Sequence, residues 1–226
     1  MSKHANLRLT AKLLPIIAPF IAKADIRYCL NGINVRPHKD GGAIITATNG
    51  HALGAIHDPG AVCEHEVTLR FDTRMQQACA TGLSSDREVV MVGGRLAVVE
   101  KGGLEVYIQA ERPEIEGNFP RYERVIPKEE SLRPGLLGTY GAKVLVPAEN
   151  AALAAAKLFS RHFTGMQFFN VNGDANASAV FRLPVAPGFV GVLMPMREDI
   201  FKSAVPAWVT DLHTAAEATA TAGSAA

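Results

Sequence analysis

Few residues in this 226-residue chain could carry out a reaction, and the most suggestive are one cysteine and one histidine. Cys63 and His65 are two positions apart, a spacing that puts both side chains on one face of a β-strand. A thiol beside an imidazole can act as a nucleophile–base pair. The sequence shows neither an acid to orient the imidazole nor an oxyanion motif, so a Cys/His hydrolase is only a remote alternative.

The other residues with reactive or ligand-forming side chains follow no motif. The aspartates fall at expected turns and helix caps, namely Asp58, Asp72 and Asp86. The three cysteines are an odd number and lack C-x-x-C spacing, so neither a disulfide framework nor a zinc site is indicated by Cys29, Cys63 and Cys79. The stretch VGGRLAVVEKGG contains no strand-to-helix transition and predicts a hairpin rather than a phosphate loop. We therefore expect no enzyme activity, no cofactor and no metal.

Composition and charge predict a reduced, cytoplasmic globular protein. Apolar residues make up 48% of the chain and charged residues 20%, the mixture of a globular rather than a disordered protein. No apolar run reaches the roughly 18 residues of a membrane span, and the first ten residues, MSKHANLRLT, lack the apolar core of a signal peptide. The formal net charge is +1, so contact with nucleic acid would need a local cluster of basic residues.

The segment EGNFPRYERVIP, residues 116–127, combines features that conflict. Pro120 and Pro127 lack the backbone N–H that a helix interior or a central strand requires. Phe119 and Tyr122 are nevertheless too apolar for an ordinary solvated linker. The sequence therefore predicts an irregular segment whose apolar side chains need a role of their own.

Hydrophobic periodicity predicts an α+β fold built from repeated βαβββ units. The chain should begin with a helix over residues 8–23 that Pro15 and Pro19 break or kink. Turn residues and alternating apolar residues then predict strands over 26–35, 43–48, 53–56 and 65–71. A short helix over 72–82, with Asp72 as its N-cap, precedes strands predicted over 87–92, 94–100 and 104–110.

A third unit is expected after a Gly/Pro-rich link over residues 131–141. It should consist of a strand over 143–149, an alanine-rich helix over 150–160, and strands over 166–173, 178–184 and 188–196. The small-residue tail over 201–226 is expected to be disordered. The predicted domains are therefore a full one over 1–126 and a reduced one over 127–200.

Four stretches together resemble one protein family. DIRYCLNGI, TATNGHALGA, GNFPRYERVIP and VLMPMR, in this order and at these separations, are similar to motifs of the bacterial DNA polymerase III beta subunit, the sliding clamp. The resemblance covers residues 25–197 and falls on the second and third domains of the family. It implies the DNA-clamp fold, in which antiparallel sheets carry helices on one face. The shortened third domain suggests a phage or mobile-element version.

The resemblance also implies a role for the irregular segment. In sliding clamps this segment connects two domains and lines a hydrophobic groove that binds short linear peptides of polymerases and other replication proteins. Carried over position by position, the groove would be formed by Leu30, Thr48, Gly50, His51, Leu53, Pro120, Arg124, Val125, Val192, Leu193, Met194, Pro195, Met196 and Arg197. Methionines and prolines suit such a site, because they supply an adaptable surface on a wall of fixed shape.

Each groove motif also has a plainer interpretation. The FP and MPM stretches can be ordinary core and edge-strand packing, and His51 can be a turn residue whose imidazole bonds the backbone. Two positions depart from the family pattern. Ala52 stands where the family has a basic residue, and Asn49 stands where it has an acidic one, so the preference for peptides is expected to differ.

Duplex DNA is the second partner that the resemblance implies, bound through phosphates and without sequence readout. The residues expected to face DNA are Arg8, Lys12, Lys23, Arg27, Tyr28, Arg74, Lys157 and Arg161. Because this supply of cations is thin, a monomer or dimer is expected rather than a closed ring. The predicted function is a non-catalytic polymerase processivity factor; the alternative is a clamp-like peptide-binding adaptor or decoy that does not encircle DNA.

Overall fold

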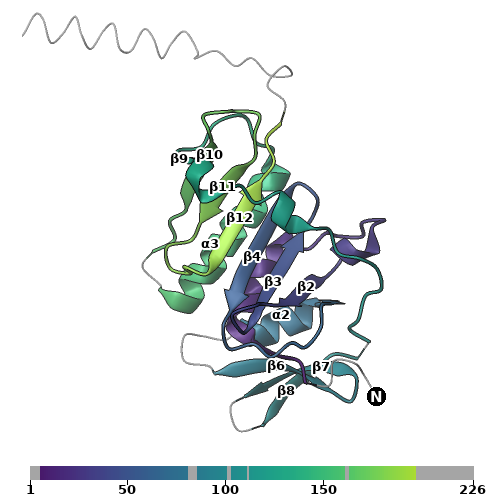
Figure 1. The fold of residues 1–226 in the computed structure, drawn as a ribbon. Helices are drawn as coiled ribbons and strands as arrows, with labels where there is room; N and C mark the ends of the chain where they lie inside the picture. Colours follow the sequence, from purple (N-terminus) through teal and green to yellow (C-terminus); the bar gives the residue numbers. More distant parts are fainter. Residues whose placement is uncertain (1–5, 81–85, 101–102, 111, 161–162, 197–226) are drawn as a thin grey trace, which may run out of the picture. The chain divides into compact units, whose positions relative to one another are not determined.

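The computed structural model describes residues 6–80, 86–100, 103–110, 112–160 and 163–196. These residues form three successive βαβββ units, as the sequence predicts (Figure 1). The first unit contains β1 (Arg8–Thr10), η1 (Ala11–Leu13), α1 (Leu14–Ile17), η2 (Ala18–Phe20), β2 (Ile33–Pro37), β3 (Ala43–Thr48) and β4 (Ala52–Asp58). The second contains β5 (Val67–Leu69), α2 (Thr73–Cys79), β6 (Arg87–Val92), β7 (Arg95–Glu100) and β8 (Glu105–Ile108). The third contains β9 (Leu132–Pro134), α3 (Ala142–Phe159), β10 (Gln167–Val171), β11 (Ala179–Arg182) and β12 (Phe189–Leu193).

The first two units exchange their first strands. β1 of the first unit pairs with β6 of the second, in a four-stranded sheet of order β1-β6-β7-β8. In return, β5 of the second unit pairs with β2 of the first. The third unit keeps its own first strand, because β9 pairs with β10.

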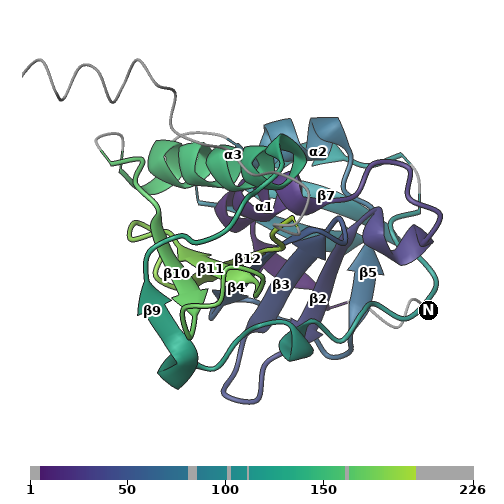
Figure 2. The ribbon, with the colours of Figure 1, turned by 90° about the horizontal axis from the view of Figure 1, so that it is seen from above.

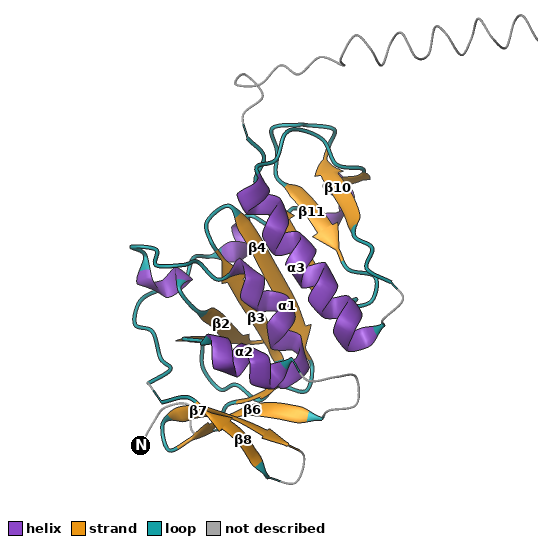
Figure 3. Cartoon of the chain, turned by 180° about the vertical axis from the view of Figure 1, so that it is seen from behind, coloured by secondary structure: helices purple, strands orange, loops and turns teal. Residues whose placement is uncertain are grey.

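The other eight strands form one sheet of order β5-β2-β3-β4-β12-β11-β10-β9, antiparallel throughout. The helices α1, α2 and α3 lie on the same side of the molecule (Figure 3). The connector, which we define as residues 113–131 between β8 and β9, crosses the other side of the eight-stranded sheet (Figure 2). Since β4 pairs with β12, the sheet is continuous between the two predicted domains, and a domain boundary near residue 126 stays a prediction.

The main hydrophobic core lies between the helices and the sheets. Phe20, Phe181 and Phe189 meet there, with ring centroids 5.3 to 6.3 Å apart. Gly54 on β4 and Gly191 on β12 are directly opposite each other in the strand pairing. A Cβ on Gly54 would lie 2.4 Å from the Phe20 ring and one on Gly191 would lie 1.9 Å from the Phe181 ring, so the glycine pair makes room for the aromatic rings.

A second, smaller hydrophobic cluster lies on the opposite face of the eight-stranded sheet. We call it the outer cluster; its buried members are Ala22, Leu30, Leu53, Ala55, Phe119, Tyr122 and Val192. Phe119 and Tyr122 come from the connector and pack edge to face, with ring centroids 6.4 Å apart. The apolar residues of the irregular segment therefore cover a sheet face that would otherwise be exposed.

The start of the chain differs from the prediction in two places. Residues 8–10 form β1 rather than a helix, because Leu9 is buried while the strand pairs with β6. The helix begins only at Ala11, and prolines limit α1 to four residues between 3-10 turns, as expected. Residues 26–30 are not a strand; the chain forms the 3-10 turn η3 (Tyr28–Leu30) instead.

The prediction was also wrong for residues 143–149, which belong to the 18-residue helix α3 rather than to a strand. Buried residues recur along α3 at helical spacing, for instance Val144, Ala148, Ala151 and Ala155. The valines flanking Leu145 favoured a strand locally, but the buried stripe of the whole segment decides its structure. The first strand of the third unit is β9, inside the stretch expected to be a link.

The other predicted strands and α2 are present, with boundaries shifted by a few residues. Asp72 caps α2 as expected, since its side chain accepts a hydrogen bond of 2.7 Å from the Met75 N–H. No helix among the described residues is long and apolar enough to cross a bilayer. The same residues contain no group of three or more His, Cys, Asp or Glu side chains placed to hold a metal ion.

Candidate functional site

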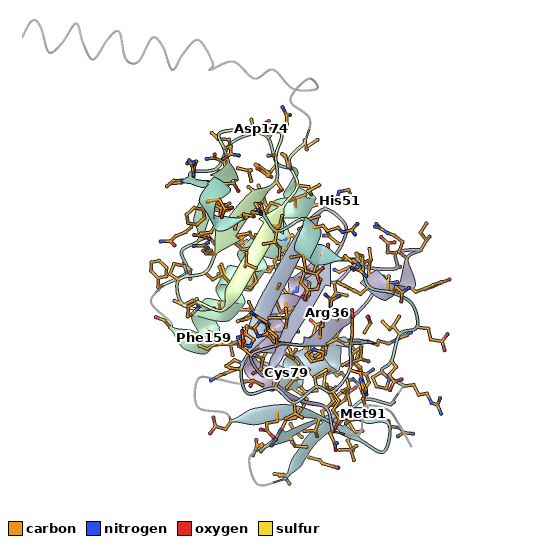
Figure 4. All side chains as sticks on the ribbon, viewed as in Figure 1. Arg36, His51, Cys79, Met91, Phe159 and Asp174 are labelled. Atoms are coloured by element: carbon orange, nitrogen blue, oxygen red, sulfur yellow. The ribbon has the colours of Figure 1, made fainter. Side chains whose placement is uncertain are left out.

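A cavity of about 210 Å³ opens on the outer face of the eight-stranded sheet, where β4, β12, η3 and the connector meet. Figure 4 shows His51, which lies in the turn just before β4 and lines this cavity. We call this cavity the groove. Its lining residues are Arg27, Leu30, Thr48, Gly50, His51, Ala52, Leu53, Pro120, Arg121, Tyr122, Val125, Val192 and Met194.

The floor of the groove is set by the alternation of side chains along β4 and β12. Leu53 lies opposite Val192 in the strand pairing, and both side chains face the outer cluster. The next residue of β12, Leu193, therefore points into the main core, where it is fully buried. Beyond the strand, the Met194 N–H donates to the His51 carbonyl at 2.9 Å, and the Met194 side chain is 45% exposed.

The turn between β3 and β4 is built by local side-chain hydrogen bonds. The Asn49 Oδ1 accepts from the backbone N–H groups of His51 and Ala52, at 2.9 and 2.8 Å. The Thr48 hydroxyl donates to the Ala52 carbonyl at 2.8 Å and accepts from the Gly50 N–H at 3.1 Å. These bonds fix the turn that presents His51, whose side chain is exposed. The turn is thus formed by Asn49 and Thr48, and not by the imidazole of His51.

One end of the groove is closed by an arginine held over a glycine. Gly50 has φ +86°, and a Cβ at this position would lie 2.8 Å from an Arg27 guanidinium nitrogen. The guanidinium is fixed by Asp25, with N–O distances of 3.0 and 2.9 Å. These hydrogen bonds from Arg27 lower the pKa of the Asp25 carboxyl to about 2. Asn31 completes the loop, because its side chain bonds both the N–H and the carbonyl of Asp25 at 2.8 Å.

The connector supplies the opposite wall. It forms the 3-10 turn η4 (Tyr122–Arg124), in which the Tyr122 N–H donates to the Pro120 carbonyl at 2.8 Å. Tyr122 is buried in the outer cluster, whereas Val125 remains 42% exposed at the groove. The wall is therefore anchored by a buried aromatic ring and presents proline and valine side chains to the cavity.

The structure brings most of the predicted groove residues around one cavity. Nine of them line it, namely Leu30, Thr48, Gly50, His51, Leu53, Pro120, Val125, Val192 and Met194. Arg124, Pro195 and Met196 do not line it; the Met196 N–H donates to the Thr139 carbonyl at 2.7 Å instead. Leu193 lies in the core, and Arg197 falls outside the described residues. A peptide-binding role for the nine stays a prediction.

Four lining residues are outside the predicted set, Arg27, Ala52, Arg121 and Tyr122, although Ala52 was noted there as a departure from the family pattern. Tyr122 and Arg121 could have been found, because they follow Pro120 directly in a segment already assigned to the groove. Arg27 could not have been found, because its position depends on the loop that Asp25 and Asn31 form. The alternating apolar residues at 26–30 had predicted a strand there instead.

The residues expected to face DNA are placed on different elements. Lys12, Arg74 and Lys157 lie on helical segments, as expected. Arg8 lies on β1 with a guanidinium nitrogen 4.0 Å from Glu88, so it is not a helix residue. Three others do not lie on α1, α2 or α3: Lys23 follows η2, Arg27 lines the groove, and Tyr28 is in η3. Arg161 falls outside the described residues.

Cys63 does not have the geometry of an activated nucleophile. Its thiol donates to the backbone carbonyl of His65 at 3.0 Å. Burial raises the pKa of the Cys63 thiol, whereas a nucleophilic cysteine needs a lowered pKa. These observations weigh against the Cys/His hydrolase.

Comparisons with known proteins connect this architecture with one group. No protein-family model and no curated protein sequence matches the chain. Among solved structures, a DNA polymerase sliding clamp from Pseudomonas aeruginosa is similar with a TM-score of 0.61 and 16% identity, over 87% of this chain and 68% of that one. The beta sliding clamp of Caulobacter crescentus is similar with a TM-score of 0.58 and 18% identity, over 87% and 67%.

A third similar structure carries a ligand. The sliding clamp of Bartonella birtlesii, DNA polymerase III subunit beta, was solved bound to griselimycin; its TM-score is 0.56 at 16% identity, over 87% of this chain and 68% of that one. At these identities the likeness establishes the architecture alone. The chain has the fold of the bacterial DNA polymerase III beta sliding clamps.

Proposed function

We propose that this protein binds short linear peptides of replication proteins, such as a DNA polymerase, in the groove, and thereby acts as a clamp-like tethering factor without catalysis. The observation that carries the proposal is that four segments far apart in the sequence meet at one cavity. Segments near residues 30, 50, 122 and 193, which resemble four separate sliding-clamp motifs, supply the lining of a single cavity. The chance that unrelated packing motifs would meet in this way is small.

The chemistry of the groove supports an apolar peptide anchor. Leu30, Leu53 and Val192 form an apolar floor, and Met194 adds a flexible thioether that can adapt to different side chains. The connector wall is fixed before binding, which lowers the entropy lost when a peptide docks. Arg121 adds a positive charge at the edge of this mainly apolar site, so an acidic residue beside the peptide anchor is expected to be tolerated.

Fluorescence anisotropy with a labelled peptide of the Q-x-x-L/F type tests this proposal. We expect saturable binding, and we expect the same peptide with its Leu or Phe replaced by Asp not to bind. Leu153→Ala is a control variant that should bind the peptide as the unaltered protein does. Leu153 is an apolar residue about as exposed as Met194, but it lies on α3 rather than in the groove. Absence of binding at high micromolar protein would reject the proposed function and leave the fold unaffected.

A second candidate is an adaptor that binds the same peptides but does not encircle DNA. Two of the cations expected to face DNA already interact within the chain, which favours the adaptor. Arg27 pairs with Asp25 at 2.9 Å, and the Lys12 ammonium lies 5.5 Å from the centroid of the Phe159 ring. Light scattering at several protein concentrations, with and without duplex DNA, separates the two candidates. A stable trimer or tetramer that retains DNA would favour the encircling clamp, whereas a monomer or dimer with weak, salt-sensitive DNA binding would favour the adaptor.

A further inference from the structure

A second and larger cavity, of about 780 Å³, lies on the other side of the connector from the groove. We call it the polar hollow. Figure 4 shows Arg36, one of its lining residues, on β2. The hollow lies between the outer faces of β2 and β5 and the connector segment 114–123, and Arg121 lines both cavities.

The walls of the hollow are fixed by backbone and side-chain contacts. The connector begins as an extra strand at the edge of the sheet, because the Arg70 N–H donates to the Pro113 carbonyl at 2.6 Å and the Ile115 N–H donates to the Thr68 carbonyl at 2.8 Å. At the far end, Phe119 is buried in the outer cluster. The segment between these two anchors spans the hollow, so the cavity exists without a ligand.

The floor of the hollow contains a buried side chain with an unused acceptor. Asn34 is fully buried, and its Nδ2 donates to the Glu66 carboxylate at 3.0 Å and to the Thr68 hydroxyl at 3.3 Å. This orientation of the amide is fixed, since the carboxylate can only accept. The Oδ1 of Asn34 has no hydrogen-bond partner among the described residues. A buried acceptor of this kind favours a ligand that brings N–H donors.

The charges around the hollow are unequal. Four glutamates line it, Glu66, Glu114, Glu116 and Glu123, against two arginines, Arg36 and Arg121, so the lining carries a net charge of −2.

Arg36 is already engaged within this lining. Its guanidinium bonds Glu66 at 3.1 Å, forms an ion pair with Glu123, and lies 5.0 Å from the centroid of the Tyr122 ring. Glu116, by contrast, is exposed and makes no hydrogen bond or ion pair with any described residue. The Glu116 carboxylate is therefore available to a cation from outside the chain.

We propose that the polar hollow binds a cationic side chain, the guanidinium of an arginine in a partner polypeptide. A guanidinium has five N–H donors in one plane, enough to bond a carboxylate such as Glu116 and the Asn34 carbonyl oxygen together. Ile115, which is partly exposed on the connector, offers apolar surface to the methylene groups of the arginine. Where the partner is the peptide bound in the groove, which rests on the proposed function, an arginine near its anchor residue would cross the connector into the hollow.

The test uses the full chain and two small probes of nearly equal shape. Nα-acetyl-arginine amide carries the charged guanidinium, whereas Nα-acetyl-citrulline amide replaces it with a neutral urea. In ¹⁵N–¹H correlation spectra we expect the arginine probe to shift the Asn34 side-chain amide saturably and the citrulline probe not to do so. Equal shifts with both probes, or no shift with either, would overturn the proposal.

Variants separate the hollow from the groove. Glu116→Gln removes an exposed carboxylate and should lower the affinity for the arginine probe about threefold, which is the effect of losing one solvent-accessible ion pair. Glu105→Gln, on the edge strand β8, is the matched control and should leave binding unchanged. Met194→Ala should also leave probe binding unchanged, because Met194 lines only the groove. A protein that binds the groove peptide but not the arginine probe would refute the hollow alone, and the reverse result would refute the groove alone.

Discussion

The two faces of the eight-stranded sheet are built from alternate residues of the same strands, yet they differ in how completely they are covered. The inner face is sealed by α1, α3 and the phenylalanine cluster of the main core. The outer face is covered only along the connector, which leaves the groove on one side and the polar hollow on the other. The inner face thus accounts for most of the apolar burial, and the partly covered outer face holds both proposed binding sites.

Two neighbouring residues at the end of β12, Leu193 inside the strand and Met194 just after it, offer the sharpest test of this division. Leu193 is fully buried in the main core, so Leu193→Ala should lower the free energy of unfolding by about 2–5 kcal/mol. Met194, the next residue, is 45% exposed, and Met194→Ala should change stability by less than about 0.5 kcal/mol. Urea unfolding followed by circular dichroism measures both. Similar losses in the two variants would show that the faces are not independent.

The reactivities of the three cysteines compare the main core with less completely covered regions of the protein. Cys79 is buried in the main core, and burial raises the pKa of its thiol to about 12. Cys29 and Cys63 are only partly buried. At neutral pH an alkylating reagent should therefore modify Cys79 the slowest of the three, because the thiolate is the reactive species and Cys79 is also the most buried cysteine.

Mass spectrometry of labelled peptides at several times gives the three rates. Selective, fast labelling of Cys63 that is abolished by His65→Ala would instead revive the Cys/His hydrolase.

Removing a groove contact should affect binding and little else. Met194→Ala should weaken binding of the Q-x-x-L/F peptide by about 1–2 kcal/mol, the scale of one buried anchor contact at an interface. Anisotropy titrations of this variant beside Leu153→Ala measure the difference. Unchanged affinity would mean that the bound peptide does not contact the Met194 side chain.

The sequence predicted the inner face better than the outer one. Alternation in β3, β4 and β12 identifies the buried residues, because a strand shows its two faces with a period of two. The groove could be assigned only through resemblance, since its residues come from segments as distant as Leu30 and Met194. The hollow was not predicted at all. It depends on where the connector pairs with β5, and no periodic signal marks that isolated pairing at Glu114.

Local propensity failed where tertiary contacts or side-chain caps decide the backbone. Residues 143–149 look like a strand until the helical spacing of buried alanines further along α3 is included. Residues 26–30 alternate like a strand, but the Asn31 side chain accepts from the Asp25 N–H and donates to the Asp25 carbonyl, which closes a loop. Both errors arise because a window of a few residues does not contain the partner that fixes its structure.

The smallest expected effect concerns the loop that holds Arg27 at the end of the groove. Hydrogen bonds from Arg27 lower the pKa of Asp25 from 3.8 to about 2. A group whose pKa is lower in the folded state contributes stability above its unfolded pKa and loses it as the pH falls through the folded value. The contact between Asp25 and Arg27 should therefore persist at pH 4 and weaken as the pH approaches 2.

Because the Arg27 side chain of this ion pair is 56% exposed and the Asp25 side chain 20% exposed, solvent screens the pair and its effect on overall stability should be slight. The Gly50 amide beneath the guanidinium is the better probe. A pH titration of its NMR shift should show a midpoint near the Asp25 pKa of about 2, and Asp25→Asn should remove that step. A midpoint near the ordinary value of 3.8 would mean that solvent competes successfully for the carboxylate. Arg27 would then be free to leave Gly50, and this end of the groove, unlike the connector wall, would be formed only when a peptide binds.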